Sequence, residues 1–169
     1  YTSFYYPSIV LKVDSGVPLS NHILVGMYGV LDTAGVLGGS VDVAVEGDDC
    51  DPIYGPCPDV RNHDGGTIRA SDHAVQMNSV GDVTNNSGSL IEGGNAAVWL
   101  AAGSVTNDGD GSVIRSPNGS AIDVEHGQGD IVNTGGAVIS SGGTAIILAY
   151  GGSVTNGAGS TIETQDTTP

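Results

Sequence analysis

The chain has 169 residues and carries 19 Asp and Glu against 4 Lys and Arg, which gives a formal charge of −15 at pH 7. A surface this acidic repels the phosphates of nucleic acids and of anionic lipids, so neither is an expected partner, and no apolar run reaches the roughly 20 residues that span a membrane. Gly and Pro together make 35 residues (28 and 7), about a fifth of the chain, which is below the range of disordered low-complexity proteins, so we expect one folded domain.

Residues 1–58 form a β-rich but irregular part, which we expect to cap or begin the main fold. Strand-like runs occur at 9–13, 22–31 and 41–45, but the repeat of the later residues is missing. The extreme start holds half of the aromatic residues of the chain, and such clusters anchor contacts in pockets. We interpret it either as a lid over the first coil or as a contact between subunits. The residues concerned are Tyr1, Phe4, Tyr5 and Tyr6.

The two cysteines, Cys50 and Cys57, lie in one short acidic loop that is rich in proline. The chain begins at Tyr1 and not at Met, as a processed export product does. In an exported chain, two cysteines that enclose a small ring usually form a disulfide. We therefore expect a secreted protein, extracellular or on a cell surface, with a Cys50–Cys57 disulfide; a pair of free thiols is the alternative.

From residue 59 to 169 the chain repeats three apolar marks. The first mark is a tetrapeptide that ends in asparagine, at Asn62, Asn85, Asn107, Asn133 and Asn156. The second mark is an isoleucine, which recurs at intervals of 23, 23, 25 and 23 residues at Ile68, Ile91, Ile114, Ile139 and Ile162. The third mark follows at Val75, Val98, Ile122 and Ile146. Such periods are typical of solenoids, in which each turn buries its apolar row against its neighbours.

Three short strands per repeat, joined by turns rich in Gly, Asn and Asp, predict an all-β fold, a right-handed parallel β-helix with about 22–26 residues per coil. No stretch keeps a helical apolar period of 3.6 residues, so helix should be nearly absent. Two parts of the chain follow from this pattern. Residues 1–58 are a capping or junction segment, and residues 59–169 are the β-helix repeats.

Two ladders of polar residues should run along the stacked coils. The asparagine that ends each first strand recurs at one corner, where amides at the coil spacing of about 4.8 Å can hydrogen-bond along the axis. The residues that follow the first three isoleucines are Arg69, Glu92 and Arg115, so their charges alternate in register on the outer face. Both ladders are interpreted as structural.

A third outward row consists of Gln76, Trp99, Asp123 and Ile147, the middle residues of successive third strands. An exposed Trp and Ile on one sheet face commonly mark a contact with a partner. We therefore predict that Trp99 and Ile147 serve lateral packing between subunits. A platform for a sugar at Trp99 is the alternative.

The repeats resemble the passenger regions of large proteobacterial autotransporters and related secreted adhesins. The likeness is carried by the Gly-Gly-Ser-Val-Thr-Asn and Ser-Thr-Ile segments within 151–162 and by Thr-Ala-Ile-Ile-Leu at 144–148, and it extends over 59–163. It implies a β-helix that is exported and acts at a surface.

Enzymes such as pectin lyases and phage tailspike hydrolases use carboxylates on the same kind of helix. The outward carboxylates available here are Glu92, Asp123 and Glu163, with Glu125 at a corner, and only Asp123 and Glu125 are neighbours. The histidines share no metal-binding spacing; they are His22, His63, His73 and His126. We therefore expect no catalytic and no metal site.

Calcium is an alternative use of two acidic loops, because carboxylate oxygens are the ligands it prefers. One loop holds Asp48, Asp49 and Asp51, and the other holds Asp108 and Asp110. Their spacing matches no known calcium loop, so we expect no cofactor and assign these charges to solvation.

The sequence thus predicts a non-enzymatic extracellular β-helix that assembles as a homo-oligomer, the subunit of a filament or surface fibre. An adhesin fragment that binds a glycan or a host surface is the main alternative, and a polysaccharide-degrading enzyme of the tailspike type is a weaker one.

Overall fold

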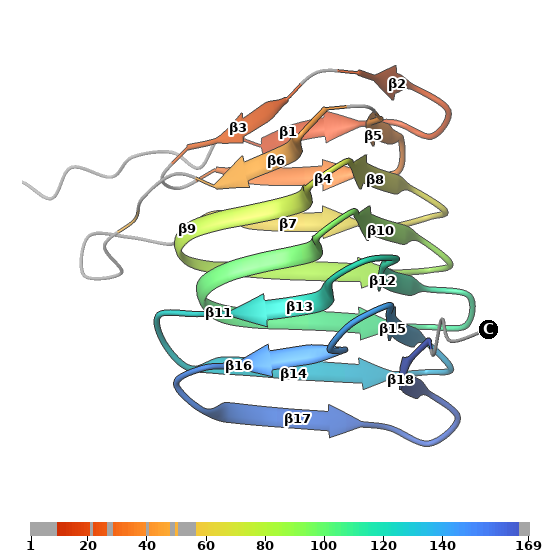
Figure 1. The fold of residues 1–169 in the computed structure, drawn as a ribbon. Coiled ribbons are helices and arrows are strands. Elements are labelled where there is room, and N and C mark those ends of the chain that lie inside the picture. The colour runs from red at the N-terminus through yellow and green to blue at the C-terminus, as the bar shows by residue number, and fades with distance from the viewer. Residues whose placement is uncertain are drawn as a thin grey trace, which may run out of the picture.

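The computed structural model describes residues 10–20, 22–26, 29–39, 41–47, 50 and 57–165. Within these ranges the chain consists of strands, turns and bends without helix, so they contain no helix that could cross a membrane. Parallel strands stack as a β-solenoid of about six turns, with the N-terminal coils at one end and the last coil at the other (Figure 1). The predicted all-β parallel β-helix is confirmed.

Each complete coil contributes one strand to each of three sides. The first side holds β1 (Val10–Val13), β4 (Val30–Thr33), β7 (Asp59–Asn62), the second half of β9 (His73–Asn86), the second half of β11 (Ala96–Asp108), β14 (Gly129–Thr134) and β17 (Gly152–Asn156). The second side holds β2 (Pro18–Leu19), β5 (Val36–Gly38), β8 (Thr67–Ala70), β10 (Leu90–Gly93), β12 (Val113–Ser116), β15 (Val138–Ser141) and β18 (Thr161–Thr164). The third side holds β3 (Ile23–Val25), β6 (Val43–Gly47), the first halves of β9 and β11, β13 (Ser120–Val124) and β16 (Ile146–Leu148).

Hydrogen bonds join the described strands into two parallel sheets. The second side is a 7-stranded sheet, whereas the first and third sides together form an 11-stranded one. The two sides merge because β9 and β11 run around the corner between them without a break. Each complete coil therefore has the three predicted strand segments, but two of its three sides belong to one continuous sheet.

The apolar marks of the sequence form the core. Ile68 pairs with Ile91, Ile91 with Ile114, and the series continues through Ile139 to Ile162. The first four of these side chains are fully buried. Burial of an aliphatic side chain of this size contributes about 1.5–3 kcal/mol, so each coil is held mainly by its contact with the next.

The N-terminal part belongs to the same solenoid. Strands β1 to β6 form two coils, because β1 pairs with β4 and β4 pairs with β7 in the ladder that the later coils extend. In the second of these coils, Val45 takes the position of Val75 in the third coil.

The Cys50–Cys57 disulfide is present, and it closes a loop between β6 and β7. The backbone N–H of Cys50 donates to Ser79 Oγ at 2.8 Å, which ties the loop to the next coil. Several residues of interest lie outside the described residues: Tyr1, Phe4, Tyr5, Tyr6, Asp48, Asp49 and Asp51.

Glycine is required at the corner where the chain passes from the third side to the first. Gly103 has φ +125, and a Cβ there would lie 1.9 Å from the carbonyl oxygen of Gly81. Gly152 has φ +135 and the same close approach to Gly129. These four glycines pair in register, but only Gly103 and Gly152 have the positive φ, so the bend recurs in two of these four coils.

Candidate functional site

The five asparagines of the first strands are hydrogen-bonded in series. Each Nδ2 donates to Oδ1 of the next amide, at 2.8 Å from Asn62 to Asn85, 2.8 Å to Asn107, 2.9 Å to Asn133 and 2.8 Å to Asn156. The first four side chains are fully buried. They also donate to backbone carbonyls of their own turn and of the second side of the next coil. The donor groups of these four amides are occupied within the fold, and the amides are buried, so the ladder presents no ligand site.

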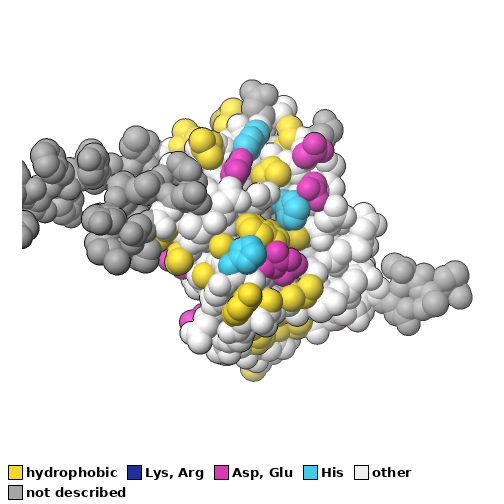
Figure 2. Space-filling model, turned by 60° about the vertical axis from the view of Figure 1, so that its left-hand side comes forward, with side chains coloured by type: hydrophobic (Ala, Val, Ile, Leu, Met, Phe, Trp, Pro, Cys, Tyr) yellow, Lys and Arg dark blue, Asp and Glu magenta, His cyan; other side chains and the backbone are white. Residues whose placement is uncertain are grey.

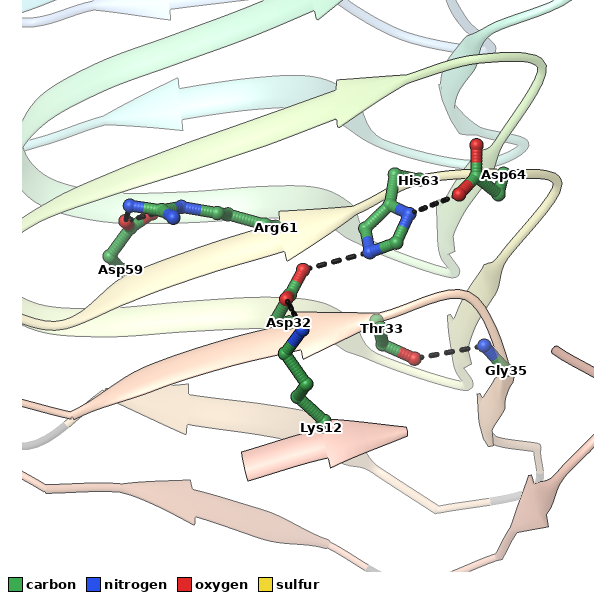
Figure 3. Close-up of polar contacts among 8 residues, drawn as sticks. All are labelled: Lys12, Asp32, Thr33, Gly35, Asp59, Arg61, His63 and Asp64. Carbon is green, nitrogen blue, oxygen red and sulfur yellow. Dashed lines mark hydrogen bonds and ion pairs between the residues drawn. The ribbon is translucent and has the colours of Figure 1, made fainter. Parts of the chain in front are cut away.

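The ladder changes character toward the N-terminus. Thr33 takes the position of Asn62 in the coil before it, and its Oγ1 accepts from Gly35 N–H at 3.1 Å (Figure 3). Asn62 Oδ1 is buried without a hydrogen-bond partner. The chain of amides therefore begins at Asn62 and continues toward the C-terminal coils.

The charge ladder is also formed. Arg69 Nε lies 2.7 Å from Glu92 Oε1, and the Arg115 guanidinium pairs with Glu92 Oε2. The other two basic residues of the chain are paired as well, Lys12 with Asp32 at 3.4 Å and Arg61 with Asp59, whose Oδ2 lies 2.8 Å from Arg61 Nε. Every Lys and Arg of this protein thus has a carboxylate partner, and Arg69 and Arg115 share Glu92.

A histidine joins two carboxylates on the first side (Figure 3). His63 Nε2 lies 2.8 Å from Asp32 Oδ1, and His63 Nδ1 lies 2.8 Å from Asp64 Oδ2. Asp32 comes from the coil before, so this contact links two coils. Among the described residues, no group of three His, Cys, Asp or Glu side chains is placed to hold a metal ion. The cluster is a network of polar contacts within the fold.

The third side carries the outward row in the predicted register. Gln76 pairs with Trp99, Trp99 with Asp123, and Asp123 with Ile147. Trp99 is partly exposed, and the ring of His126 meets it edge-on with centroids 5.9 Å apart and an interplanar angle of 78°. Figure 2 shows histidine, acidic and apolar side chains gathered on this face.

Asp123 stands apart from the other carboxylates. Burial, and then the charge of Glu125, raise the pKa of Asp123 above its ordinary value of 3.8, while the charge of His73 opposes them. Asp123 Oδ1 is buried and has no hydrogen-bond partner. His73 is itself engaged, since its Nδ1 lies 3.0 Å from Asp72 Oδ2, an ion-pair distance without hydrogen-bond geometry.

The four outward carboxylates predicted from the sequence therefore lie in two separate places. Glu92 and Glu163 lie on the second side, whereas Asp123 lies on the third side and Glu125 follows it at a corner. The sequence predicts that Trp99 and Ile147 share one face, but it does not place His126 beside Trp99, because a residue at an irregular corner carries no periodic signal.

No family model, no curated protein and no solved structure matches the chain. The resemblance to adhesin passengers is thus supported at the level of the β-solenoid alone.

Proposed function

We propose that this protein is a non-enzymatic structural subunit of an extracellular filament or surface fibre, in which solenoids stack end to end. The supporting observation concerns one column of apolar residues that stand in register along the first side. Their side chains are buried in the middle coils but exposed in the first and the last coil. In this column Leu31, Val60 and Val83 are at most 1% exposed. Leu11 in the first coil is 44% exposed and Val154 in the last coil is 47% exposed.

The strands of the first and last coils each have one edge whose backbone N–H and C=O groups are not paired with another described strand. Among the described residues, β17 pairs only with β14 and β18 only with β15, whereas β1 pairs only with β4 and β2 only with β5. An unpaired strand edge is a template for a further strand. A head-to-tail contact would set Val154 against Leu11 of a second copy and keep all strands parallel. Such a contact does not close on itself, so it produces a fibre.

The disulfide supports the extracellular part of the proposal, since disulfides persist in oxidising compartments. The pairing of all Lys and Arg side chains, together with the occupied amide ladder, supports a structural use of most polar groups. The aromatic start, which lies outside the described residues, is proposed as part of the junction.

Sedimentation velocity over a concentration series tests the stacking. The wild-type chain should grow into large species, and Val154→Asp and Leu11→Asp should each leave a monomer, because either change puts a charge into the junction. Val36→Asp is the matched control, since Val36 is 49% exposed but lies on the flank. It should assemble like the wild type.

Two results would overturn the fibre. A wild-type chain that stays monomeric at every concentration excludes stacking. A dimer that is lost in Val154→Asp but kept in Leu11→Asp means that two C-terminal ends meet, which is a closed contact.

An adhesin remains the second candidate function, and the observation that favours it is the outward row with Trp99 on the third side. Binding of a glycan or host surface there, by a chain that remains monomeric, would support this candidate.

A further inference from the structure

A patch on the third side combines aromatic, apolar and acidic side chains. Its members are Trp99, Asp123, Glu125, His126, Ile147 and Tyr150, which we call the Trp99 patch. Trp99, Asp123 and Ile147 are neighbours across three successive coils. Glu125 and His126 follow β13 at the corner and are exposed.

Tyr150 extends the patch by one coil. Ala149 N–H donates to the carbonyl of Val124 at 3.0 Å, so Tyr150 leaves the third side one coil beyond His126. It is 65% exposed, the highest value among the large apolar side chains of the described residues. Trp99 on the third side, and His126 and Tyr150 at the corner that follows it, therefore come from three successive coils.

No Lys or Arg of the chain is paired with the carboxylates of the patch, although the charge of His73 acts on Asp123. Asp123 Oδ1 has no hydrogen-bond partner, and the neighbouring Glu125 adds a second negative charge. The four Lys and Arg of the chain are paired with carboxylates elsewhere. Glu125 is exposed and Asp123 is partly exposed, so carboxylate acceptors remain at the surface of the patch, and a donor that carries positive charge satisfies them best.

One N–H of each of the two amides next to the patch is already engaged. Gln76 Nε2 donates to Asn78 Oδ1 at 2.9 Å, and Asn78 Nδ2 donates to Glu46 Oε1 at 2.8 Å. Neutral sugars are usually held by such amides together with an aromatic ring. The charged acceptors of the patch are the carboxylates of Asp123 and Glu125, which favours a cation over a sugar.

We infer that the Trp99 patch binds a basic side chain, arginine or lysine, of a partner polypeptide. The cation lies against the Trp99 ring and pairs with the Asp123 carboxylate, with Glu125 and Tyr150 beside it. The net charge of −15 attracts such a partner from a distance. The patch is on the flank, so this binding does not depend on the stacking of the ends.

Trp99 is the one tryptophan of the chain, so its fluorescence reports on the patch alone. The probe is a hexa-arginine peptide at about 0.15 M salt, where unspecific attraction is screened. The same peptide with citrulline in place of arginine keeps the shape without the charge. The Val154→Asp chain serves as the monomeric protein. Titration with hexa-arginine should change the Trp99 emission saturably, and the citrulline peptide should not.

Asp123→Asn should weaken the binding of hexa-arginine about five- to tenfold. Asp110→Asn is the matched control, because it removes the same charge from an exposed turn away from the third side. It should change the affinity less than twofold. Trp99→Leu, followed by calorimetry, should weaken binding as much as Asp123→Asn.

Three results would overturn the inference. The first is no saturable binding of hexa-arginine in emission or calorimetry. The second is equal weakening by Asp123→Asn and Asp110→Asn, which means unspecific attraction by net charge. The third is a response of Trp99 to neutral oligosaccharides without a response to hexa-arginine, which assigns the patch to a glycan.

Discussion

On both the second and the third side of the solenoid, residues of successive coils stand in register and form a column, but the two columns differ in whether their charged groups are paired. On the second side, Arg69, Glu92 and Arg115 stand in successive coils and pair with one another. On the third side, Trp99 and Asp123 stand in successive coils, and the carboxylate has an oxygen without a partner. A paired column holds the coils in register, whereas the third-side column places a partly exposed aromatic ring beside a partly exposed carboxylate.

The largest expected effect comes from breaking the amide ladder, which holds the second side in place. Asn85→Ala removes the donor to Asn107 Oδ1 and to the carbonyl of Val113, and it leaves the buried Asn107 Oδ1 without this donor. We expect a loss of about 2–4 kcal/mol in the free energy of unfolding. Urea unfolding followed by circular dichroism measures it.

Asn156→Ala is the control for the ladder. Asn156 ends the ladder and is exposed, so the same substitution should cost less than about 1 kcal/mol. Equal losses at both positions would contradict a role that depends on burial.

A smaller difference in stability is expected between substitutions of the paired carboxylate, Glu92, and of the unpaired one, Asp123. Glu92→Gln removes the partner of two arginines and should lower the free energy of unfolding by about 0.5–1 kcal/mol, because these pairs are partly exposed. Asp123→Asn removes an unpaired charge and should leave stability unchanged or slightly raised. Urea midpoints of the two variants test the difference, and a larger loss in Asp123→Asn would contradict the account.

The smallest expected effect is a dependence on pH. The folded chain raises the pKa of Asp123 above its ordinary value of 3.8, so the folded state binds this proton more tightly than the unfolded state. The stability that the proton contributes is present at low pH and is lost as the pH rises from 3.8 through the folded pKa. The gain from Asp123→Asn should therefore be larger at pH 7 than at acidic pH. An equal difference between the two urea midpoints at both pH values would be inconsistent with this pKa.

The regular part of the fold could be predicted because its residues repeat. The isoleucines of the second strands and the asparagines of the first strands recur at fixed positions, and the structure places both sets in register. The first two coils carry no such mark, since Thr33 stands where later coils have asparagine. Their place in the solenoid follows from strand pairing that composition does not reveal.

The Trp99 patch could be predicted only in part. Trp99 and Asp123 follow from the alternation along the third strands, which is periodic. His126 and Tyr150 occur at corners whose lengths vary between coils, so the sequence alone does not place them beside Trp99. Glycines 81, 103, 129 and 152 stand two residues before the apolar residue of the first mark in four of the five repeats, a regularity that is visible in the sequence.

The most direct test of end-to-end stacking is negative-stain electron microscopy of the untagged protein across a concentration series. Val154→Asp and a chain without residues 1–7, the proposed aromatic part of the junction, are imaged beside it. The account predicts filaments that lengthen with concentration in the wild type and vanish in both variants. Monodisperse particles in all three samples would contradict it.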